Sequence, residues 1–547
     1  MKRNPAELVA QTFDVIVIGA GIYGATLTLQ LAEAGLRTLV IDQGDFCSAT
    51  SANSLKILHG GLRYLQHGNI RRMRETIFSR RSLMRCAPHL TQPLACLIPT
   101  YGHGLRSRAV MRIASVLNNL ISADRNLGLP PSHHLPGGRT VGPAALAAAL
   151  PGLPVRGSSG GAIWYDALAV QSERLVLEHL LAAREQGASF CNYLRADTIT
   201  VRDNRVTGIR ASDLLDGRSF DFSAPCVVNA AGPWFDDLLT RSGIHAPPTS
   251  WAKAVNLVVN KPLNERYALG IEGQAGYRDQ DALVKRDKRF FFFVPWRGGT
   301  MIGTTYQGWQ GKKDDLRCDR ADIEAILAEV HTMHPGWGLT WEDVSFCHCG
   351  LLPMAAGTDG HADTVQLAKH SLIIDHGRKN GPEGLISLRS IKYTTAPAEA
   401  AKVTRIITSH LPRRKPQLSP RPAAVPACSP EIAALLPMLS RRYGRWAERV
   451  LAYVADEDGQ DWWLSRKEEL LRGEVRYFIR EEMAVTLADV LLRRTGLGTF
   501  RRPAADLVTR LGECMATELG WDAARREEEI RRVERLYAPL TPVQEQP

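Results

Sequence analysis

The sequence predicts an α/β fold joined to a helical C-terminal domain, and three features of the 547-residue chain lead to this prediction. Residues 13–42 read as one strand–helix–strand unit, because an apolar β-branched run, a helical run ending at Gly35 and a second apolar run follow one another. Alternating apolar residues recur from Trp251 to Gly303 and predict a second, antiparallel sheet. A proline-rich segment over 411–430 then precedes a series of helical patterns.

These features give the expected division of the chain, which is too long for a single core. We expect residues 1–410 to form the α/β region, with a substrate-binding layer inserted at about 66–160 and 250–350. Residues 411–430 are expected to be a linker, and 431–547 a separate helical domain. Inside the α/β region, 197–213 predicts a hairpin that turns at Asp203 and Asn204, and 226–232 predicts a buried strand that runs into glycine.

The composition is that of an ordinary globular protein, but its charge is strongly positive. Hydrophobic residues make up 44% of the chain, and the formal net charge is +11. This balance suits an anionic membrane surface, nucleic acid or a phosphorylated small molecule. Nucleic acid is disfavoured, because no zinc, recognition-helix or RNA-binding motif is present. No apolar run resembles a leader or a membrane span, so we expect a cytoplasmic protein, at most peripheral on the inner face of a membrane.

The ten cysteines form no evenly spaced framework. Cys347 and Cys349 flank His348, but a second pair of ligands at zinc spacing is missing. We therefore expect reduced thiols and no metal site.

The strongest motif is Gly19-Ala20-Gly21-Ile22-Tyr23-Gly24, which follows a predicted strand and opens a helix. Gly19 permits a tight turn, Gly21 lets the backbone approach a pyrophosphate, and Gly24 lets helix and strand pack closely. Asp42 ends the next strand at the distance expected for a ribose contact. The helix N-terminus offers N–H groups to phosphate oxygens. The motif predicts a dinucleotide site but does not choose between NAD and FAD.

The next segment carries a resemblance to a known family. Its residues are Ala49-Thr50-Ser51, then Ser54 and Lys56, then His59-Gly60-Gly61-Leu62-Arg63-Tyr64-Leu65. This run resembles the flavin-contacting stretch of FAD-dependent glycerol-3-phosphate dehydrogenases. Further matching stretches follow in the family's order, at 86–90, 165–177, 227–234, 293–306 and 392–395. The resemblance covers about residues 13–405, and it extends more loosely into the helical C-terminal region.

The resemblance implies FAD as the cofactor and a Rossmann-like FAD-binding domain of the glutathione-reductase/D-amino-acid-oxidase type. Small residues at 48–54 would let backbone amides run close to the pyrophosphate, and Gly60-Gly61 would leave room for the isoalloxazine ring. A helix that begins after Lys392, with Pro397 in its first turn, would point its positive end at the flavin. The cofactor-binding residues expected are Gly19, Gly21, Ile22, Tyr23, Gly24, Asp42, Thr50, Ser51, Ser54, Lys56, His59, Gly60, Gly61, Leu62, Ala231, Gly232, Lys392, Tyr393 and Thr394.

For the substrate, the resemblance implies anchoring cations at Arg63 and Lys392, with Tyr64 as a hydrogen-bonding wall. Arg389 is a candidate substitute for a missing arginine, and His59 is either a base or a residue that orients the flavin loop.

Four departures from the family's pattern stand out. Leu352 and Lys369 stand where arginines are expected, Asn256 replaces a histidine, and Ser390-Ile391 replaces a glycine pair. Losing a planar guanidinium removes a bidentate phosphate contact, so the pocket is expected to be altered.

The expected activity is oxidation of glycerol 3-phosphate or a related polar hydroxy compound by hydride transfer to flavin. Electrons would pass to a quinone or another acceptor. The alternative is an FAD-dependent oxidase of an amine or hydroxy acid that uses oxygen. Basic stretches near 70–85 and 105–113 are candidates for resting on anionic lipid, and a homodimer is left open.

Overall fold

The structure is a computed structural model of the chain, and it describes residues 3–102, 107–150, 157–276, 288–355, 365–411, 415, 428–456 and 462–540. The side chains of Arg63, Gln66 and His67 lie outside the described part, as do those of 274–276 and 288–289. The chain divides into two compact units. Unit 1 comprises Met1–Ala52, Ser172–Thr249 and Ala368–Tyr537, and unit 2 comprises Asn53–Gln171, Ser250–Leu367 and Ala538–Pro547.

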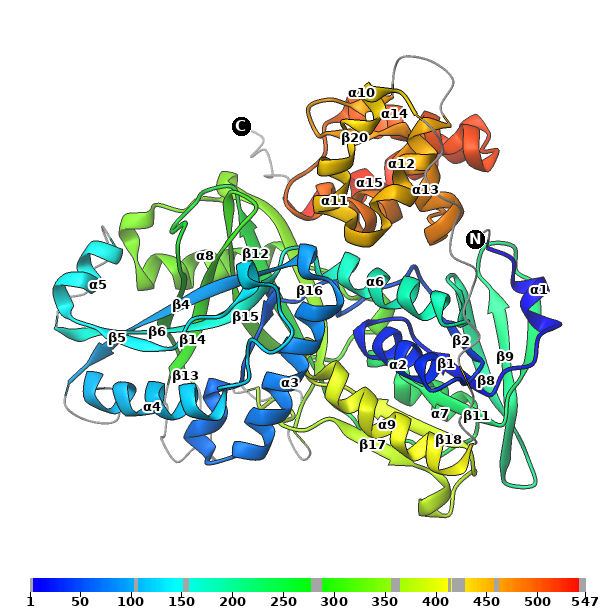
Figure 1. Cartoon of the computed structure of the whole chain (residues 1–547), viewed down its shortest axis with the longest axis horizontal. Coiled ribbons are helices and arrows are strands. Elements are labelled where there is room, and N and C mark those ends of the chain that lie inside the picture. The colour runs from blue at the N-terminus through cyan, green and yellow to red at the C-terminus, as the bar shows by residue number, and fades with distance from the viewer. Residues whose placement is uncertain are drawn as a thin grey trace. The chain divides into compact units, whose positions relative to one another are not determined.

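Unit 1 is built on a sheet with the strand order β17-β18-β11-β1-β2-β7, in which every pair is parallel except β17 with β18. Its strands are β1 (Val15–Ile18), β2 (Thr38–Ile41), β7 (Ser189–Cys191), β11 (Cys226–Asn229), β17 (Leu372–Asp375) and β18 (Leu385–Arg389). Helix α2 (Ile22–Glu33) packs between α6 (Ser172–Glu185) and α9 (Ala396–His410) (Figure 1). This is the α/β architecture that the sequence predicts.

The β1–α2–β2 unit forms because its residues agree with it at every level. The four residues of β1 and the four of β2 are all buried, as expected for a strand covered on both faces. Gly19 has φ of 100°, which only glycine adopts at little cost, and Gly35 ends the helix with φ of 79°. The predicted strand, helix and strand over 13–42 are therefore confirmed.

The remaining elements of unit 1 are a three-stranded sheet, two short strands and a set of helices. The three strands are β8 (Leu194–Arg202), β9 (Arg205–Asp213) and β10 (Ser219–Ser223). The hairpin between β8 and β9 turns at Asp203 and Asn204, which both have positive φ, as the sequence predicts. The others are α1 (Pro5–Val9), α7 (Phe235–Arg241), α10 (Pro430–Ala433), α11 (Leu436–Tyr443), α12 (Ala447–Ala455), β19 (Trp463–Ser465), β20 (Leu470–Leu471), α13 (Arg472–Glu482), a π-helical turn (Asp489–Arg494), α14 (Ala505–Leu519) and α15 (Ala523–Tyr537).

The C-terminal elements are mostly helical, and that they form a domain separate from the α/β region stays a prediction. The division into units leaves the segment from Pro430 to Tyr537 with the α/β sheet of unit 1. Most of the proline-rich segment over 411–430 lies outside the described residues.

Unit 2 is built on one large sheet with the strand order β16-β12-β15-β14-β13-β4-β6-β3, and β5 pairs with β6. All of these pairs are antiparallel except β13 with β4. The strands are β3 (Ile57–Leu58), β4 (Thr91–Tyr101), β5 (Arg139–Val141), β6 (Ser158–Ala169), β12 (Trp251–Val259), β13 (Ala268–Gly276), β14 (Lys288–Trp296), β15 (Gly299–Trp309) and β16 (Val344–Pro353). The predicted antiparallel layer is confirmed.

Among the described residues of unit 2, four α-helices accompany this sheet: α3 (Ile70–Cys86), α4 (Arg108–Ile121), α5 (Pro143–Ala149) and α8 (Arg320–Met333). The core includes Leu257, Phe291, Phe293 and Ile326. One sequence expectation is wrong here, because Cys318 and Cys347 form a disulfide instead of staying reduced. The fold brings the segment before α8 against β16, a proximity that the spacing of the cysteines does not reveal.

Candidate active site

The glycine motif forms a close-packed turn at the start of α2. A side chain at Gly24 would place its Cβ 1.8 Å from the Gly19 carbonyl oxygen, and one at Gly21 would lie 2.9 Å from Ser51 Oγ. The Ile22 N–H donates to Ser51 Oγ at 3.0 Å. A narrow turn of this kind, followed by a helix N-terminus, fits the pyrophosphate of a dinucleotide.

Asp42 lies at the end of β2, next to the glycine turn. Its carboxylate accepts hydrogen bonds from the N–H of Ala20 at 2.7 Å and of Gly44 at 2.9 Å. Burial raises the pKa of Asp42 to about 6, although these two hydrogen bonds oppose the shift. An acceptor in this position fits the ribose hydroxyls of a bound dinucleotide.

The start of α9 is tied directly to α2. The Tyr23 hydroxyl donates to the Lys392 carbonyl at 2.7 Å and lies 2.6 Å from Thr395 Oγ1. Burial raises the pKa of Tyr23 to about 12. The side chain of Tyr23 therefore aligns the N-termini of α2 and α9, and its backbone amide is the part at the predicted phosphate site.

The Lys392–Thr394 stretch is placed as the sequence predicts, directly before a helix. A 3₁₀ turn over Tyr393–Thr395 leads into α9. The Tyr393 hydroxyl donates to the Ser172 carbonyl at 2.7 Å, Thr394 is buried, and the Lys392 side chain is exposed. Thr50 and Ser51 belong to the same unit and are partly buried.

The end of β11 returns the chain to the glycine turn. The Ala230 N–H donates to the Ile18 carbonyl at 2.8 Å, and a Cβ at Gly19 would lie 2.5 Å from the Ala230 carbonyl oxygen. The Asn229 side chain accepts from the Ala231 N–H at 3.2 Å, and Gly232 has φ of 56°. The small residues predicted here are thus needed for the close approach of two loops.

In unit 2, the predicted flavin loop is held by one buried carboxylate, that of Asp166 on β6. This carboxylate accepts hydrogen bonds from the Gly60 N–H at 2.6 Å and from Arg80 Nη1 at 2.8 Å. His59 Nδ1 and Trp164 Nε1 each lie at hydrogen-bond distance from it, at 3.1 Å. Burial alone would raise the pKa of Asp166, but the contacts from His59, Arg80 and Gly60 outweigh it and lower the pKa to about 2. The carboxylate is therefore ionised, so His59 Nδ1 carries the proton in this contact.

The two glycines of this loop have close neighbours within unit 2, and the flavin contact expected for them stays a prediction. A Cβ at Gly60 would lie 2.2 Å from Arg80 Nη1, and one at Gly61 would lie 3.0 Å from the Tyr64 ring. Gly61 also has φ of 85°. A side chain at Gly60 would therefore disturb the Arg80 guanidinium, which is bonded to Asp166. Leu62 and Tyr64 lie in the 3₁₀ turn that follows, and the side chain of Arg63 lies outside the described part.

Lys56, three residues before His59, is buried. Its Nζ lies 5.7 Å from the centre of the Trp296 ring, and its carbonyl accepts from the Ala169 N–H. Ser54 Oγ accepts from the Lys56 N–H at 3.3 Å, and Lys56 has φ of 61°. These contacts fix the path of the chain ahead of His59.

The positions that depart from the family's pattern fall into different places. Asn256 is buried on β12, where it accepts from Thr304 Oγ1 at 2.6 Å and donates to the Asn53 carbonyl at 3.2 Å. Leu352 lies on β16 opposite Ala252.

The other departures, Lys369 and Ser390-Ile391, lie in unit 1, as does Arg389, the candidate substitute for a missing arginine. Arg389 Nη1 donates to Thr249 Oγ1 at 2.9 Å, and burial lowers the pKa of Arg389. Ile391 is buried, and Lys369 precedes β17. The structure therefore gives Asn256 and Arg389 clear packing partners.

Several side chains that shape these sites were not singled out from the sequence. Asp166 was inside a matching stretch, but only the fold shows that it binds His59 and Gly60. Asp45 follows Asp42 by three residues and is completely buried. The signal that the sequence offered for Asp45 was its place in a loop beside Gly44. Its arginine partners lie hundreds of residues away in sequence, so the sequence alone did not reveal them.

Together the fold and the dinucleotide cradle define a class, the nucleotide-dependent oxidoreductases with a Rossmann-like core. Comparison with known proteins makes the class specific. The family model described as FAD dependent oxidoreductase matches residues 14–387, and the model described as C-terminal domain of alpha-glycerophosphate oxidase matches residues 428–526. The chain belongs to the FAD-dependent oxidoreductase family, and its cofactor is FAD.

Known relatives match along nearly the whole chain. A glycerol-3-phosphate dehydrogenase of Synechocystis is 29% identical and covers 97% of both chains. An alpha-glycerophosphate oxidase of Lactococcus lactis is 26% identical, over 96% of this chain and 95% of the relative. The fold is also that of the glycerol-3-phosphate dehydrogenase from Bacillus halodurans complexed with FAD, at a TM-score of 0.72, 23% identity, and coverage of 99% of this chain and 98% of that one.

Proposed function

We propose that this enzyme oxidises glycerol 3-phosphate or a closely related polyol phosphate. The observation that carries the proposal is the match along almost the full length of both chains to relatives named for this substrate, C-terminal region included. An FAD-dependent oxidase of an amine or hydroxy acid remains the alternative, and no feature of the site favours it.

The residues of unit 1 would hold the cofactor. FAD, when bound, supplies the acceptor for the two electrons and the hydrogen removed from the substrate carbon. The amides at the start of α2 would bind the pyrophosphate, and Asp42 would accept from the ribose. The N-terminus of α9, aligned by Tyr23, would place the positive end of a helix toward negative charge on the cofactor.

The residues of unit 2 that we assign to the substrate are His59, Tyr64 and Arg63. Asp166 binds the Nδ1 proton of His59, so Nε2 is the ring atom that can take up a proton from a substrate hydroxyl. The ionised Asp166 would also stabilise the positive charge that the ring then carries. Tyr64 would donate a hydrogen bond, and the Arg63 guanidinium would pair with a phosphate.

The substrate proposal is tested by anaerobic bleaching of the yellow holoenzyme. Glycerol 3-phosphate should bleach the flavin absorbance, whereas glycerol and inorganic phosphate should not. Bleaching by an amine or a hydroxy acid instead, with peroxide formed in air, would establish the alternative. Arg63→Ala should raise KM for glycerol 3-phosphate by roughly tenfold or more, since a charge-assisted contact contributes about 1.5–3 kcal/mol, without loss of bound flavin.

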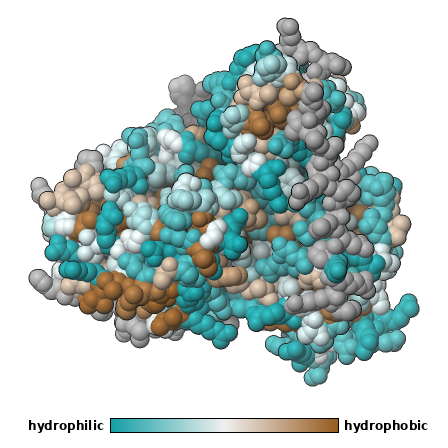
Figure 2. Space-filling model, in the orientation of Figure 1, coloured by the Kyte–Doolittle hydropathy of each residue, from teal (hydrophilic) through white to brown (hydrophobic). Residues whose placement is uncertain are grey.

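A surface of unit 2 supports a membrane location for this reaction. The apolar residues of α4 recur at the spacing of one helical face, and that face is exposed: Ile113 is 62% and Leu120 69% exposed, with Val116 and Leu117 between them. In Figure 2 hydrophobic residues gather at the lower left, where Figure 1 places α4. In the described part of the chain, no helix is long and apolar enough to span a bilayer.

We call Ile113, Val116, Leu117 and Leu120 the α4 face. Exposed Arg112 on the same helix adds positive charge, and exposed Arg71 on α3 pairs with Glu75 at 3.8 Å. An apolar helix face with arginines beside it is the pattern of a helix that lies in the headgroup layer of an anionic bilayer. We therefore propose peripheral binding to such a membrane, where a quinone would accept the electrons.

Sedimentation with vesicles of phosphatidylcholine and phosphatidylglycerol tests this location. Leu117→Gln with Leu120→Gln should weaken binding by tenfold or more, because burying one leucine contributes roughly 1.5–3 kcal/mol. Leu214→Gln is the matched control, since Leu214 is 46% exposed on the β9–β10 connection of unit 1. High salt should weaken binding only in part. The proposal would be refuted if the Leu117→Gln, Leu120→Gln double variant sediments with vesicles as much as Leu214→Gln does, or if the wild-type protein does not sediment with them.

A further inference from the structure

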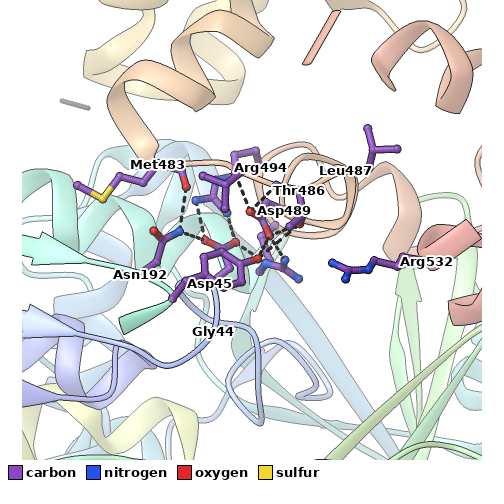
Figure 3. A network of polar contacts seen from close by, with 12 residues as sticks. Gly44, Asp45, Asn192, Met483, Thr486, Leu487, Asp489, Arg494 and Arg532 are labelled. Carbon is purple, nitrogen blue, oxygen red and sulfur yellow. Dashed lines mark hydrogen bonds and ion pairs between the residues drawn. The ribbon is translucent and has the colours of Figure 1, made fainter. Parts of the chain in front are cut away.

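The C-terminal helices meet the α/β sheet of unit 1 at a buried charge network around Asp45. This residue lies three positions after Asp42, on the loop that follows β2, and is 1% exposed. Its carboxylate accepts hydrogen bonds from Arg493 Nε at 2.5 Å and from Arg494 Nη2 at 2.9 Å, and Arg494 Nη1 also donates to it. Asn192 Nδ2 donates to the same carboxylate at 3.0 Å. Figure 3 shows Asp45 between Asn192 and Arg494.

The two arginines are themselves anchored within the C-terminal region. They occupy the end of the π-helical turn Asp489–Arg494. Arg493 Nη2 bonds to Asp489 Oδ1 at 2.5 Å, and Arg494 Nη2 donates to the Glu482 carbonyl at 2.6 Å. Asp489 in turn accepts from the N–H of Thr486 at 3.0 Å (Figure 3). Contacts within the C-terminal region thus hold both guanidinium groups in place, in addition to their bonds to Asp45.

The network is balanced in charge. Glu482 forms a two-point ion pair with Arg174 of α6, at 2.6 and 2.8 Å. Three carboxylates, those of Asp45, Asp489 and Glu482, therefore face the guanidinium groups of Arg174, Arg493 and Arg494. Removing one of these side chains would leave an uncompensated buried charge, so its loss is expected to destabilise the remaining ion pairs as well.

The Asp45 loop is continuous with the proposed ribose contact. The Gly44 N–H donates to Asp42 Oδ1, and the Gly44 carbonyl accepts from the Tyr193 N–H at 2.9 Å. A shift of Asp45 would therefore move Gly44 and, through it, the Asp42 carboxylate. The charges couple the same residues, because the Asp45 carboxylate raises the pKa of Asp42 and the Arg493 guanidinium lowers it.

We propose that the C-terminal helical region, through Arg493 and Arg494, positions the Asp42–Asp45 loop and thereby sets the affinity of unit 1 for the adenosine end of FAD. Arg493 and Arg494 are positioning residues, because they act through Asp45. This gives the region matched by the second family model a role in cofactor retention.

The test is the Kd of FAD for variants, measured by the quenching of flavin fluorescence on titration with apoprotein. Arg493→Met should raise the Kd by roughly tenfold, within the usual range for coupling between sites. Arg493→Lys, which keeps the charge, should recover part of the affinity. The matched control is Arg480→Met, because Arg480 lies in the same region but pairs with Glu518 near the surface.

A pH profile separates positioning from general destabilisation. In wild type, FAD affinity should fall as the pH drops through about 6, where Asp42 becomes protonated. In Arg493→Met this loss should occur at higher pH, because the positive charge that lowers the pKa of Asp42 is gone. A variant that is merely less stable would keep the wild-type profile. An unchanged Kd and profile in folded Arg493→Met would overturn the proposal.

A second measurement uses the unaltered chain and does not depend on a variant that folds. Coupling between two sites is reciprocal, so FAD must stabilise the C-terminal region as much as that region favours FAD binding. Adding FAD to the apoprotein should slow amide hydrogen exchange at 483–499 as well as at 42–48. Slower exchange at 42–48 alone would show that the C-terminal region is not coupled to the cofactor.

Discussion

Gly24→Ala is the most demanding test of the cofactor site, because the structure leaves no room for one methyl group. The new Cβ would lie 1.8 Å from the carbonyl oxygen of Gly19, whereas ordinary contact begins at 3.4 Å. The turn or the helix must therefore move by about 1.6 Å, and a well-packed interior resists such a shift. The displaced atoms belong to the loop whose amides would bind the pyrophosphate.

The magnitude follows from the hydrogen bonds at risk. A hydrogen bond to a charged group contributes about 1.5–3 kcal/mol, so losing one should weaken FAD binding by roughly 10- to 100-fold. Alanine favours a helix over glycine by about 1 kcal/mol, so helix propensity opposes the loss and cannot cause it.

The assay compares bound flavin per protein, the Kd of FAD and the thermal unfolding of the apoprotein. Gly512→Ala is the control, since Gly512 lies in α14 and a Cβ there would meet Arg526 of α15 at an ordinary 3.4 Å. It should keep full flavin content and gain stability. If Gly24→Ala binds FAD within about twofold of wild type, the packing argument for this turn is wrong.

Three further predictions concern stability in unit 2. The pKa of Asp166, lowered to about 2 when folded, contributes stability that is present above the unfolded value near 4 and is lost as the pH falls through about 2. Asp166→Asn should remove about 2 kcal/mol at neutral pH and flatten the acid side of a urea-unfolding profile. Cys318→Ser should cost roughly 3–4 kcal/mol, because the disulfide to Cys347 closes a loop of 29 residues, and unreduced peptide mapping should show that link in wild type. Asn256→Ala should lower the free energy of unfolding by about 1–3 kcal/mol, since the Thr304 hydroxyl loses its acceptor.

Local pattern was enough to predict the cofactor region. In 13–42 the strand, glycine spacing, helix and terminal acid all act between near neighbours, and the structure reproduces them. The hairpin at Asp203 and Asn204 was predictable for the same reason, since a two-residue turn is determined by residues that tolerate positive φ.

Residues far apart in sequence were brought together only by the fold. The link between Cys318 and Cys347 requires the segment before α8 to lie against β16, which cysteine spacing alone does not encode. Asn256, one of the departures from the family's pattern, joins the Thr304 hydroxyl to the Asn53 backbone, and the sequence does not reveal these partners. Such contacts depend on which strands pair, and strand pairing is a property of the whole sheet.

By itself, then, the sequence determined the βαβ unit, its glycine turn and, through an ordered series of motifs, a flavin enzyme. Only the tertiary structure decided that Asp166 holds the His59–Gly60 loop and that Arg493 and Arg494 reach Asp45 from some 450 residues away. The physical reason is the separation in sequence between the residues that interact. A turn or a helix start is specified by neighbouring residues, whereas a buried carboxylate must find its donors wherever the folded chain places them.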